Sequence, residues 1–366
     1  MKKLLFILLL LPLFVVSAHA ETPAGKTEDI FQTEKLTEGL GEDELRIGGD
    51  LHLDGQYDTR GALGRLWEHF RSAASAALRE SVSELAALSA LLVFTGLAAA
   101  VCESGAVRGV VELLVTCGCA LTLAGGIESL VGETLEAMYR ISDYSKAALP
   151  VVFTAAAAGG AVTSAGVRFA AVSFALDMMM TVSQRLLLPL ITAYLALTLA
   201  GGLFPNSVLS AVGRFVKWAA GIGMTVMALS FTAYLGLTSA ISTAVDASAV
   251  KLTRTVLSGT IPVVGGMLSD VSAMVLSAAG VVRNSAGAFG LVAVCALCMG
   301  PFAVLSVKSL LFKAAAVLAE SVRNARMSAL LSGVSSAVAL LLGMLGCNSL
   351  MLFLSFALGM KAVTGV

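Results

Sequence analysis

The chain has 366 residues, of which 57% are hydrophobic and only 13% are charged, and its mean hydropathy is +0.90. Soluble globular domains carry about 25% charged residues, so this composition excludes an ordinary soluble domain and indicates a protein with several membrane spans. The 24 basic and 24 acidic side chains cancel, which leaves no net positive field to attract nucleic acid.

The stretch 1–20 has the features of a secretory signal peptide. It begins with Met1-Lys2-Lys3, continues with an almost unbroken apolar run over 4–16, and ends in Ser17-Ala18-His19-Ala20. Signal peptidases cleave after such small residues, so we expect cleavage after Ala20. The signal would place the new N-terminus outside and set the direction of every later span.

The stretch 21–60 is rich in acidic residues and has little periodicity, so we expect a flexible segment outside the membrane. The pattern changes in 61–84, where Leu63, Leu66 and Phe70 recur at three- and four-residue intervals with charged residues between them. This spacing predicts an amphipathic helix. Such a helix lies either on the outer membrane surface or against the rest of the protein.

Apolar segments follow along the rest of the chain. The region 85–127 contains two predicted spans, 85–101 and 110–127, each close to the roughly 20 apolar residues that cross a bilayer. Further candidates for spans or re-entrant segments are 147–166, 169–182, 186–204, 218–241, 255–282, 286–307, 327–345 and 350–360. We therefore expect an all-α polytopic membrane protein with roughly 6–9 transmembrane or re-entrant helices.

Three features recur 112 residues apart: Pro150 and Pro262, each followed by two valines, Pro189 and Pro301, and Arg214 and Arg326. This offset predicts a tandem duplication of 140–241 and 252–346, followed by an apolar C-terminal segment, 347–366. Both halves would run in the same direction through the membrane, which makes the repeat parallel. Coincidence is the alternative, because residue identity between the halves is otherwise sparse.

Two carboxylates, Glu112 and Asp177, lie inside predicted spans. A carboxylate in a membrane costs several kcal/mol unless it is paired, protonated or hydrated. The two residues therefore either form part of a proton or cation relay, or lie near helix ends where they cap a neighbouring segment.

The most specific local motif contains Pro262, Gly265, Gly266, Ser269 and Asp270. Proline lacks a backbone donor and paired glycines permit a break, while Ser269 and Asp270 are suited to cap a following helix. Broken backbone survives at membrane depth only where protein or water surrounds it. The motif thus predicts either a re-entrant element lining a pore or interface, or a surface loop leading into an amphipathic helix.

Positive charges test the orientation. With the N-terminus outside, the basic loop with Lys308, Lys313, Arg323 and Arg326 falls in the cytoplasm, as the positive-inside rule requires. The pair Lys251 and Arg254 falls outside and violates the rule.

Recognisable catalytic and metal-binding motifs are absent from the sequence. Cys295 and Cys298 have the spacing of a redox motif, but no βαβ pattern surrounds them, so we interpret them as small packing residues. Only His52 and His69 remain after signal cleavage, too few for a histidine metal site. Walker A, HExxH, GxSxG and dinucleotide motifs do not occur. We therefore predict no catalytic residue, no cofactor, no metal and no enzymatic activity.

The order of these features resembles the stage III sporulation protein AE family over about 60–360. The resemblance rests on the leader, the acidic segment, Gly-Gly-Leu-Phe-Pro205, Lys217-Trp218 and Ile261-Pro-Val-Val-Gly-Gly-Met-Leu-Ser-Asp270. It implies a membrane component of the channel complex, or feeding tube, between mother cell and forespore. That complex is needed for spore development and late forespore gene expression.

The resemblance also implies a location and partners. The protein would lie in the mother-cell membrane around the forespore, with its N-terminal segment in the intermembrane space beside ring-forming subunits. The basic loop would face the mother-cell cytoplasm, where an ATPase of the complex would dock. No catalytic residue is carried over from the family.

The main alternative is an ion- or proton-coupled secondary transporter that uses Glu112 or Asp177. An intramembrane enzyme is the weakest alternative because the sequence offers no nucleophile with a base. The 36 glycines permit close helix packing and are compatible with a homo-oligomer.

Overall fold

The computed structural model describes residues 37, 40–48, 59–101, 105–158, 162–204, 206–257, 265–322 and 324–361. The predicted signal peptide and most of the acidic segment lie outside these ranges. Every regular element within them is a helix, and the described part contains no strand. The prediction of an all-α fold is therefore confirmed.

The described ranges contain one short helix and six long helical units. They are α3 (Glu42–Gly48), α4 (Thr59–Val101), α5 (Gly105–Ala158), a continuous unit of α6 (Val162–Val182), η3 (Ser183–Leu187) and α7 (Leu188–Leu203), α8 (Ser207–Leu257), α9 (Gly265–Ser321) and α10 (Ala325–Lys361). Each long unit is apolar enough over a sufficient length to cross a membrane. The count lies at the lower end of the predicted range because several apolar segments belong to one helix.

Several boundaries predicted from hydropathy lie inside helices. The amphipathic helix and the first span form α4, and the C-terminal segment predicted from residue 347 continues α10. The segments 169–182 and 186–204 join through the π-helix η3. Polar side chains such as Arg185 interrupt an apolar run without interrupting the backbone hydrogen bonds, so hydropathy alone divides a helix that is continuous.

Two of the long helices contain an internal proline. Pro150 lies inside α5, and Pro301 lies inside α9, which runs from Gly265 to Ser321. Each proline removes one backbone donor from the ladder, and membrane helices tolerate this where neighbouring groups compensate. The segments 255–282 and 286–307, which were predicted as separate, both belong to α9 from Gly265 onward.

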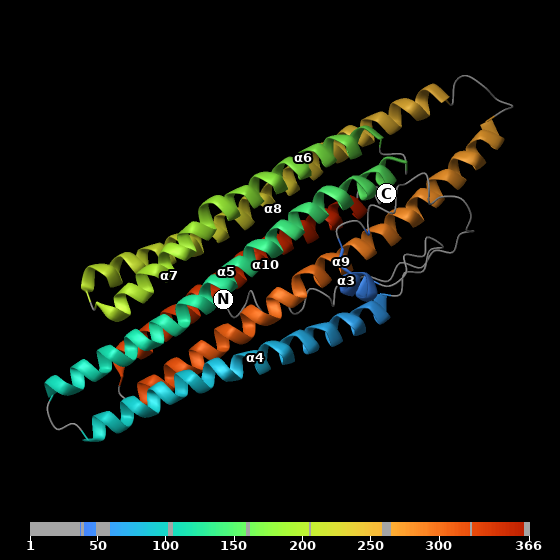
Figure 1. Ribbon diagram of the computed structural model, residues 1–366. Coiled ribbons are helices and arrows are strands. Elements are labelled where there is room, and N and C mark those ends of the chain that lie inside the picture. Colours follow the sequence, from blue (N-terminus) through green and yellow to red (C-terminus); the bar gives the residue numbers. More distant parts are fainter. Residues whose placement is uncertain are drawn as a thin grey trace.

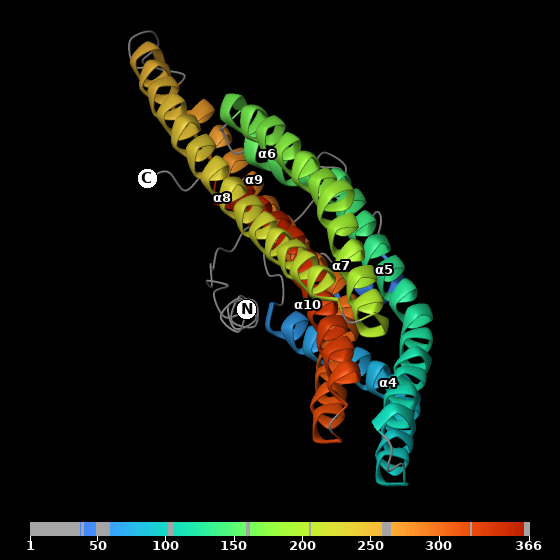
Figure 2. The ribbon, with the colours of Figure 1, turned by 90° about the vertical axis from the view of Figure 1, so that its left-hand side faces the viewer.

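The long helices run roughly along one direction and form an elongated bundle (Figure 1, Figure 2). The pair α9 and α10 forms its centre: 61% and 72% of their most apolar windows are buried, against 22% for α4. Their antiparallel register is fixed by contacts such as Ser309 with Ser335 and Cys298 with Ser349. Gly290 lies directly against the Phe356 ring, which permits the two helices to approach closely.

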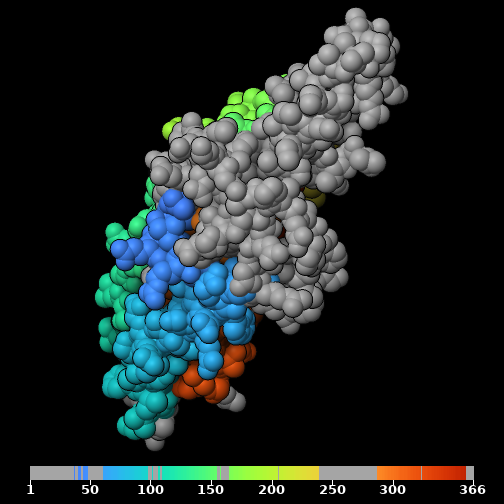
Figure 3. All heavy atoms as spheres, turned by 90° about the vertical axis from the view of Figure 1, so that its right-hand side faces the viewer, coloured from blue at the N-terminus to red at the C-terminus, as the bar shows by residue number. Residues whose placement is uncertain are grey.

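The remaining helices surround this centre. α4 packs along α9, with Leu66 beside Ala296 near one end and Gly96 beside Val322 near the other, so the two run parallel. α5 packs on both central helices, and α8 packs on α10. On the face shown in Figure 3, α3 lies over one end of α4 and beside α5, where Glu44 accepts a hydrogen bond from Arg140.

The helices are much longer than one bilayer. α5, α8 and α9 have 54, 51 and 57 residues. At 1.5 Å per residue these helices are about 75–85 Å long, whereas the hydrocarbon core is about 30 Å thick. The bundle therefore extends well beyond the membrane.

The duplication of 140–241 and 252–346 stays a prediction. The unit α6–α7 with α8, and α9 with α10, are consecutive helix pairs from the two halves. Superposing one pair on the other tests the idea, and pairs that do not overlay would exclude it.

Candidate functional site

A buried ion pair joins α4 to α9. The Nζ atom of Lys308 donates a hydrogen bond to Oε1 of Glu84 at 2.5 Å, although the two residues are 224 positions apart. The Lys308 side chain is 6% exposed and the Glu84 side chain 35% exposed. Lys308 was predicted to lie in a cytoplasmic loop, and that position is wrong: it lies within α9.

The pair explains how a lysine is accommodated inside the bundle. An unpaired ammonium in an apolar interior costs several kcal/mol, and a carboxylate partner offsets much of that cost. Glu84 itself lies where the exposed face of α4 changes from charged (Arg79, Glu80) to apolar (Val93, Phe94). The contact thus fixes the register of α4 against α9 at the boundary between its polar and apolar parts.

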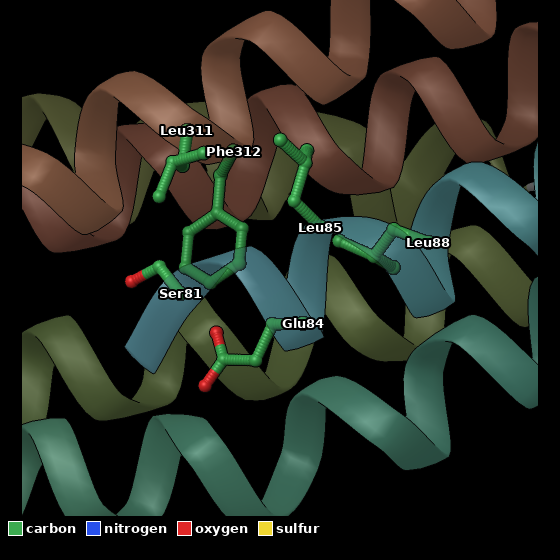
Figure 4. A pocket seen from close by; sticks show the side chains of 6 residues that line it. All are labelled: Ser81, Glu84, Leu85, Leu88, Leu311 and Phe312. Atoms are coloured by element: carbon green, nitrogen blue, oxygen red, sulfur yellow. The ribbon is translucent and has the colours of Figure 1, made fainter. Parts of the chain in front are cut away.

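A small cavity of about 10 Å³ lies beside this contact. Ser81, Glu84, Leu85 and Leu88 line it from α4, and Leu311 and Phe312 line it from α9 (Figure 4). Its volume is at the lower limit for one water. Within the described part of the chain, the buried Oγ of Ser81 has no hydrogen-bond partner. The cavity is too small for an organic substrate, so this site suits helix attachment rather than catalysis.

A second polar contact lies at the π-helix η3. The buried Oγ of Ser183 donates to Oδ1 of Asn348 at 3.1 Å and lies 3.3 Å from the sulfur of Met227. The Nδ2 of Asn348 in turn donates to the carbonyl of Met344. One hydrogen-bonded group thereby connects the central helix α10 to the widened turn between α6 and α7, and π-turns of this kind often occur at functional positions.

The predicted intramembrane carboxylates do not share a site. Glu112 is half-buried near the start of α5, and Asp177 is exposed on α6. α5 and α6 are consecutive antiparallel helices that meet near Phe153 and Phe169. Counting from that end at 1.5 Å per residue, the two carboxylates are about 50 Å apart along the bundle. They therefore do not form a direct relay with each other.

The predicted broken segment falls partly outside the described residues, since Pro262 is not among them. Gly265, Gly266, Ser269 and Asp270 all belong to α9, whose first residue is Gly265. Ser269 and Asp270 thus lie inside α9, after its first turn. From Gly265 onward the backbone is continuous helix rather than a broken element.

The other predicted basic residues are spread over two elements. Lys313 is exposed on α9, Arg326 is half-buried in the first turn of α10, and Arg323 lies outside the described residues. The connection between α9 and α10 is therefore much shorter than the loop predicted from Lys308 to Arg326.

The surroundings of Cys295 and Cys298 are those of residues that pack between helices. Cys295 and Cys298 are free thiols on α9, and the Cys298 sulfur lies 2.8 Å from Oγ of Ser349. In the described ranges, no group of three His, Cys, Asp or Glu side chains is arranged to hold a metal ion.

Sequence reasoning missed Ser81, Glu84, Ser183 and Asn348. Ser183 and Asn348 carried a local signal, since each is a polar residue between two apolar runs. The importance of the others arises from partners far away in the chain, which a periodic pattern does not identify.

The described helices and their polar contacts define a multi-pass helical membrane protein in which polar side chains attach one helix to another. A family model described as Stage III sporulation protein AE (spore_III_AE) matches residues 56–362. The chain belongs to the stage III sporulation protein AE family, and this membership supports a role in sporulation.

One curated relative is similar to part of the chain. The chain is 23% identical over 230 residues to the Stage III sporulation protein AE of Bacillus subtilis (strain 168). This match covers 62% of the chain and 56% of the relative, so it spans about half the length of that protein. No solved structure matches the chain.

Proposed function

We propose that the protein is a structural membrane subunit of the channel complex between mother cell and forespore. The observation that carries this proposal is the family match over residues 56–362. The membrane-spanning character of all six long helical units in the described ranges supports it. A structural role is supported by the cavity beside Glu84, which at about 10 Å³ is too small for a substrate.

The proposed orientation follows from helix alternation. If the segment before α4 is outside, α4 runs inward, and the connections α4–α5, α7–α8 and α9–α10 face the mother-cell cytoplasm. Arg214 and Arg326 lie beside two of these connections, in agreement with the positive-inside rule. The opposite end of the bundle, with α3, would face the intermembrane space.

The outer and cytoplasmic ends of the helix bundle would contact different partners. The outer end, where α3 is attached by Glu44 to Arg140, is suited to contact ring-forming subunits. The cytoplasmic end presents the α7–α8 and α9–α10 connections as the surface for an ATPase. Since Lys308 is buried, we assign this surface to the short connections and not to an extended basic loop.

Cysteine labelling tests the orientation. In a background without native cysteines, single cysteines replace Asp50 and Ser321, and a membrane-impermeant maleimide is applied to intact protoplasts of non-sporulating cells that produce the protein, where the outer segment would face the medium. We expect labelling at position 50 and protection at position 321 until the membrane is opened. Equal labelling at both positions would overturn the orientation.

Deletion tests the function. A deletion strain of the protein's own host should engulf the forespore normally but fail to sustain late forespore gene expression, measured with a fluorescent reporter. The wild-type chain should restore expression. Normal reporter expression in the deletion strain would contradict a role in the channel.

A further inference from the structure

Two lysines from different helices lie together without a carboxylate. Lys217 on α8 is half-buried and contacts Ser336 on α10, while Lys313 on α9 is exposed and lies one turn beyond Ser309, which contacts Ser335 on α10. The two lysines therefore lie beside the same part of α10, close enough for their charges to interact. Among the described residues, neither has a carboxylate oxygen within 4.0 Å. Lys308, five residues before Lys313, differs in having Glu84 as its partner. Like charges held together in this way favour an external anion.

Lys217 is positioned by α10. Its Nζ donates to Oγ of Ser336 at 2.9 Å, and Ser336 donates to the carbonyl of Ser332. An ammonium has three donors, so Ser336 occupies one and directs the others outward. Arg214, exposed one turn earlier on α8, adds positive charge, while the exposed acid nearest along α9 is Glu320, two turns beyond Lys313.

The residues of α8 around Lys217 are typical of a helix at the membrane–water interface. Phe215 and Trp218 are exposed at 63% and 59%, and their rings are 5.8 Å apart. Exposed aromatic side chains gather at the level of lipid headgroups. Beyond them, residues 218–245 carry no charge, and Ile222, Val226 and Leu229 are exposed on α8. Cations therefore lie at the edge of an apolar surface that suits acyl chains.

We propose that Lys217, Lys313 and Ser336 form a binding site for the phosphate headgroup of an anionic phospholipid. The headgroup phosphate bridges the two ammonium groups, and the acyl chains lie along the exposed face of α8. The lipid thereby neutralises the repulsion between the two lysines, whose helices α8 and α9 both pack on α10. Basic sites between membrane helices bind anionic headgroups in this manner.

Lipid titration of the purified full-length chain tests the site. Native mass spectrometry would give dissociation constants for phosphatidylglycerol, for phosphatidylcholine and for inorganic phosphate. At about 1 kcal/mol for each lysine near an anionic headgroup, Lys313→Gln should weaken phosphatidylglycerol binding about fivefold, and Lys217→Gln with Lys313→Gln about 25-fold. The charge-retaining pair Lys217→Arg with Lys313→Arg should bind nearly as the wild type does. The control Lys146→Gln, at a 63% exposed lysine on α5, should change nothing.

Thermal unfolding in nanodiscs separates binding from folding. In phosphatidylcholine alone, removing the two charges should leave the melting temperature unchanged or raise it, because repulsion is relieved. Adding phosphatidylglycerol should raise the melting temperature of the wild type and not that of the double glutamine variant. Equal shifts in both proteins, or phosphatidylglycerol affinity equal to that for phosphatidylcholine, would overturn the proposal. Phosphate binding as tight as lipid binding would assign the site to free phosphate instead.

Discussion

The ion pair between Lys308 and Glu84 gives the sharpest energetic prediction. Glu84→Gln leaves the 6% exposed ammonium of Lys308 without its charge partner inside the bundle. Losing one member of a buried pair costs about 3–5 kcal/mol, and we expect a value near the lower end, about 3 kcal/mol, because the glutamine amide oxygen can still accept a hydrogen bond from the ammonium.

The reverse substitution should cost less. Lys308→Met leaves the Glu84 carboxylate, which is 35% exposed and keeps part of its hydration. We expect a loss of about 1–2 kcal/mol. The double variant removes both charges and should unfold within about 1 kcal/mol of the wild type, which gives a coupling energy of at least about 3 kcal/mol.

Chemical unfolding in mixed micelles, followed by the fluorescence of Trp67 and Trp218, measures these free energies. The matched control is Lys146→Gln at the exposed pair with Asp143, 3.8 Å apart, where solvent screening limits the change to about 0.5 kcal/mol. The argument would be refuted if the free-energy losses of the two single variants added up in the double variant. A loss for Lys146→Gln equal to that for Glu84→Gln would also refute it.

Three other substitutions probe the packing and the alternatives. Gly290→Ala should lower the free energy of unfolding by about 1–3 kcal/mol in the same assay, because the new methyl group would overlap the Phe356 ring. The control Gly236→Ala, whose new carbon meets open space, should be neutral or stabilising. Equal effects of the two substitutions would contradict the close packing of α9 on α10. Asn348→Ala should cost about 1–2 kcal/mol by removing the acceptor of Ser183, and little further loss should follow when Ser183→Ala is added; an additive loss would argue against the contact. Glu112→Gln with Asp177→Asn should leave heat-resistant spore counts near the wild-type level, since a structural subunit moves no proton or ion through either carboxylate. Loss of sporulation by a stably produced variant would favour the secondary transporter.

The sequence predicted the fold class because membrane spans depend on local composition. A run such as 286–307 is apolar whatever its neighbours are, so its presence in a helix follows from sequence alone. Helix ends depend on more than composition. Lys308 ended the predicted span, but its charge is matched by Glu84 from a helix more than 200 positions away. Only the folded arrangement reveals that partner.

The π-helix shows the same limit at another position. Ser183, Gln184 and Arg185 separate two apolar runs, which indicated two spans with a link between them. In the fold, Ser183 faces inward to Asn348 while Arg185 is exposed, so the backbone continues as one helical unit. The polar contacts of the candidate site could not be predicted for the same reason, because each joins separate helices.

Capture from sporulating cells tests the central claim most directly. The full-length chain, carrying an affinity tag at its C-terminus, is cross-linked in membranes isolated after engulfment and identified with its neighbours by mass spectrometry. We predict that ring-forming sporulation subunits and the ATPase are recovered together with it. Recovery of the chain alone from membranes in which those subunits are present and cross-linked to one another would contradict the account.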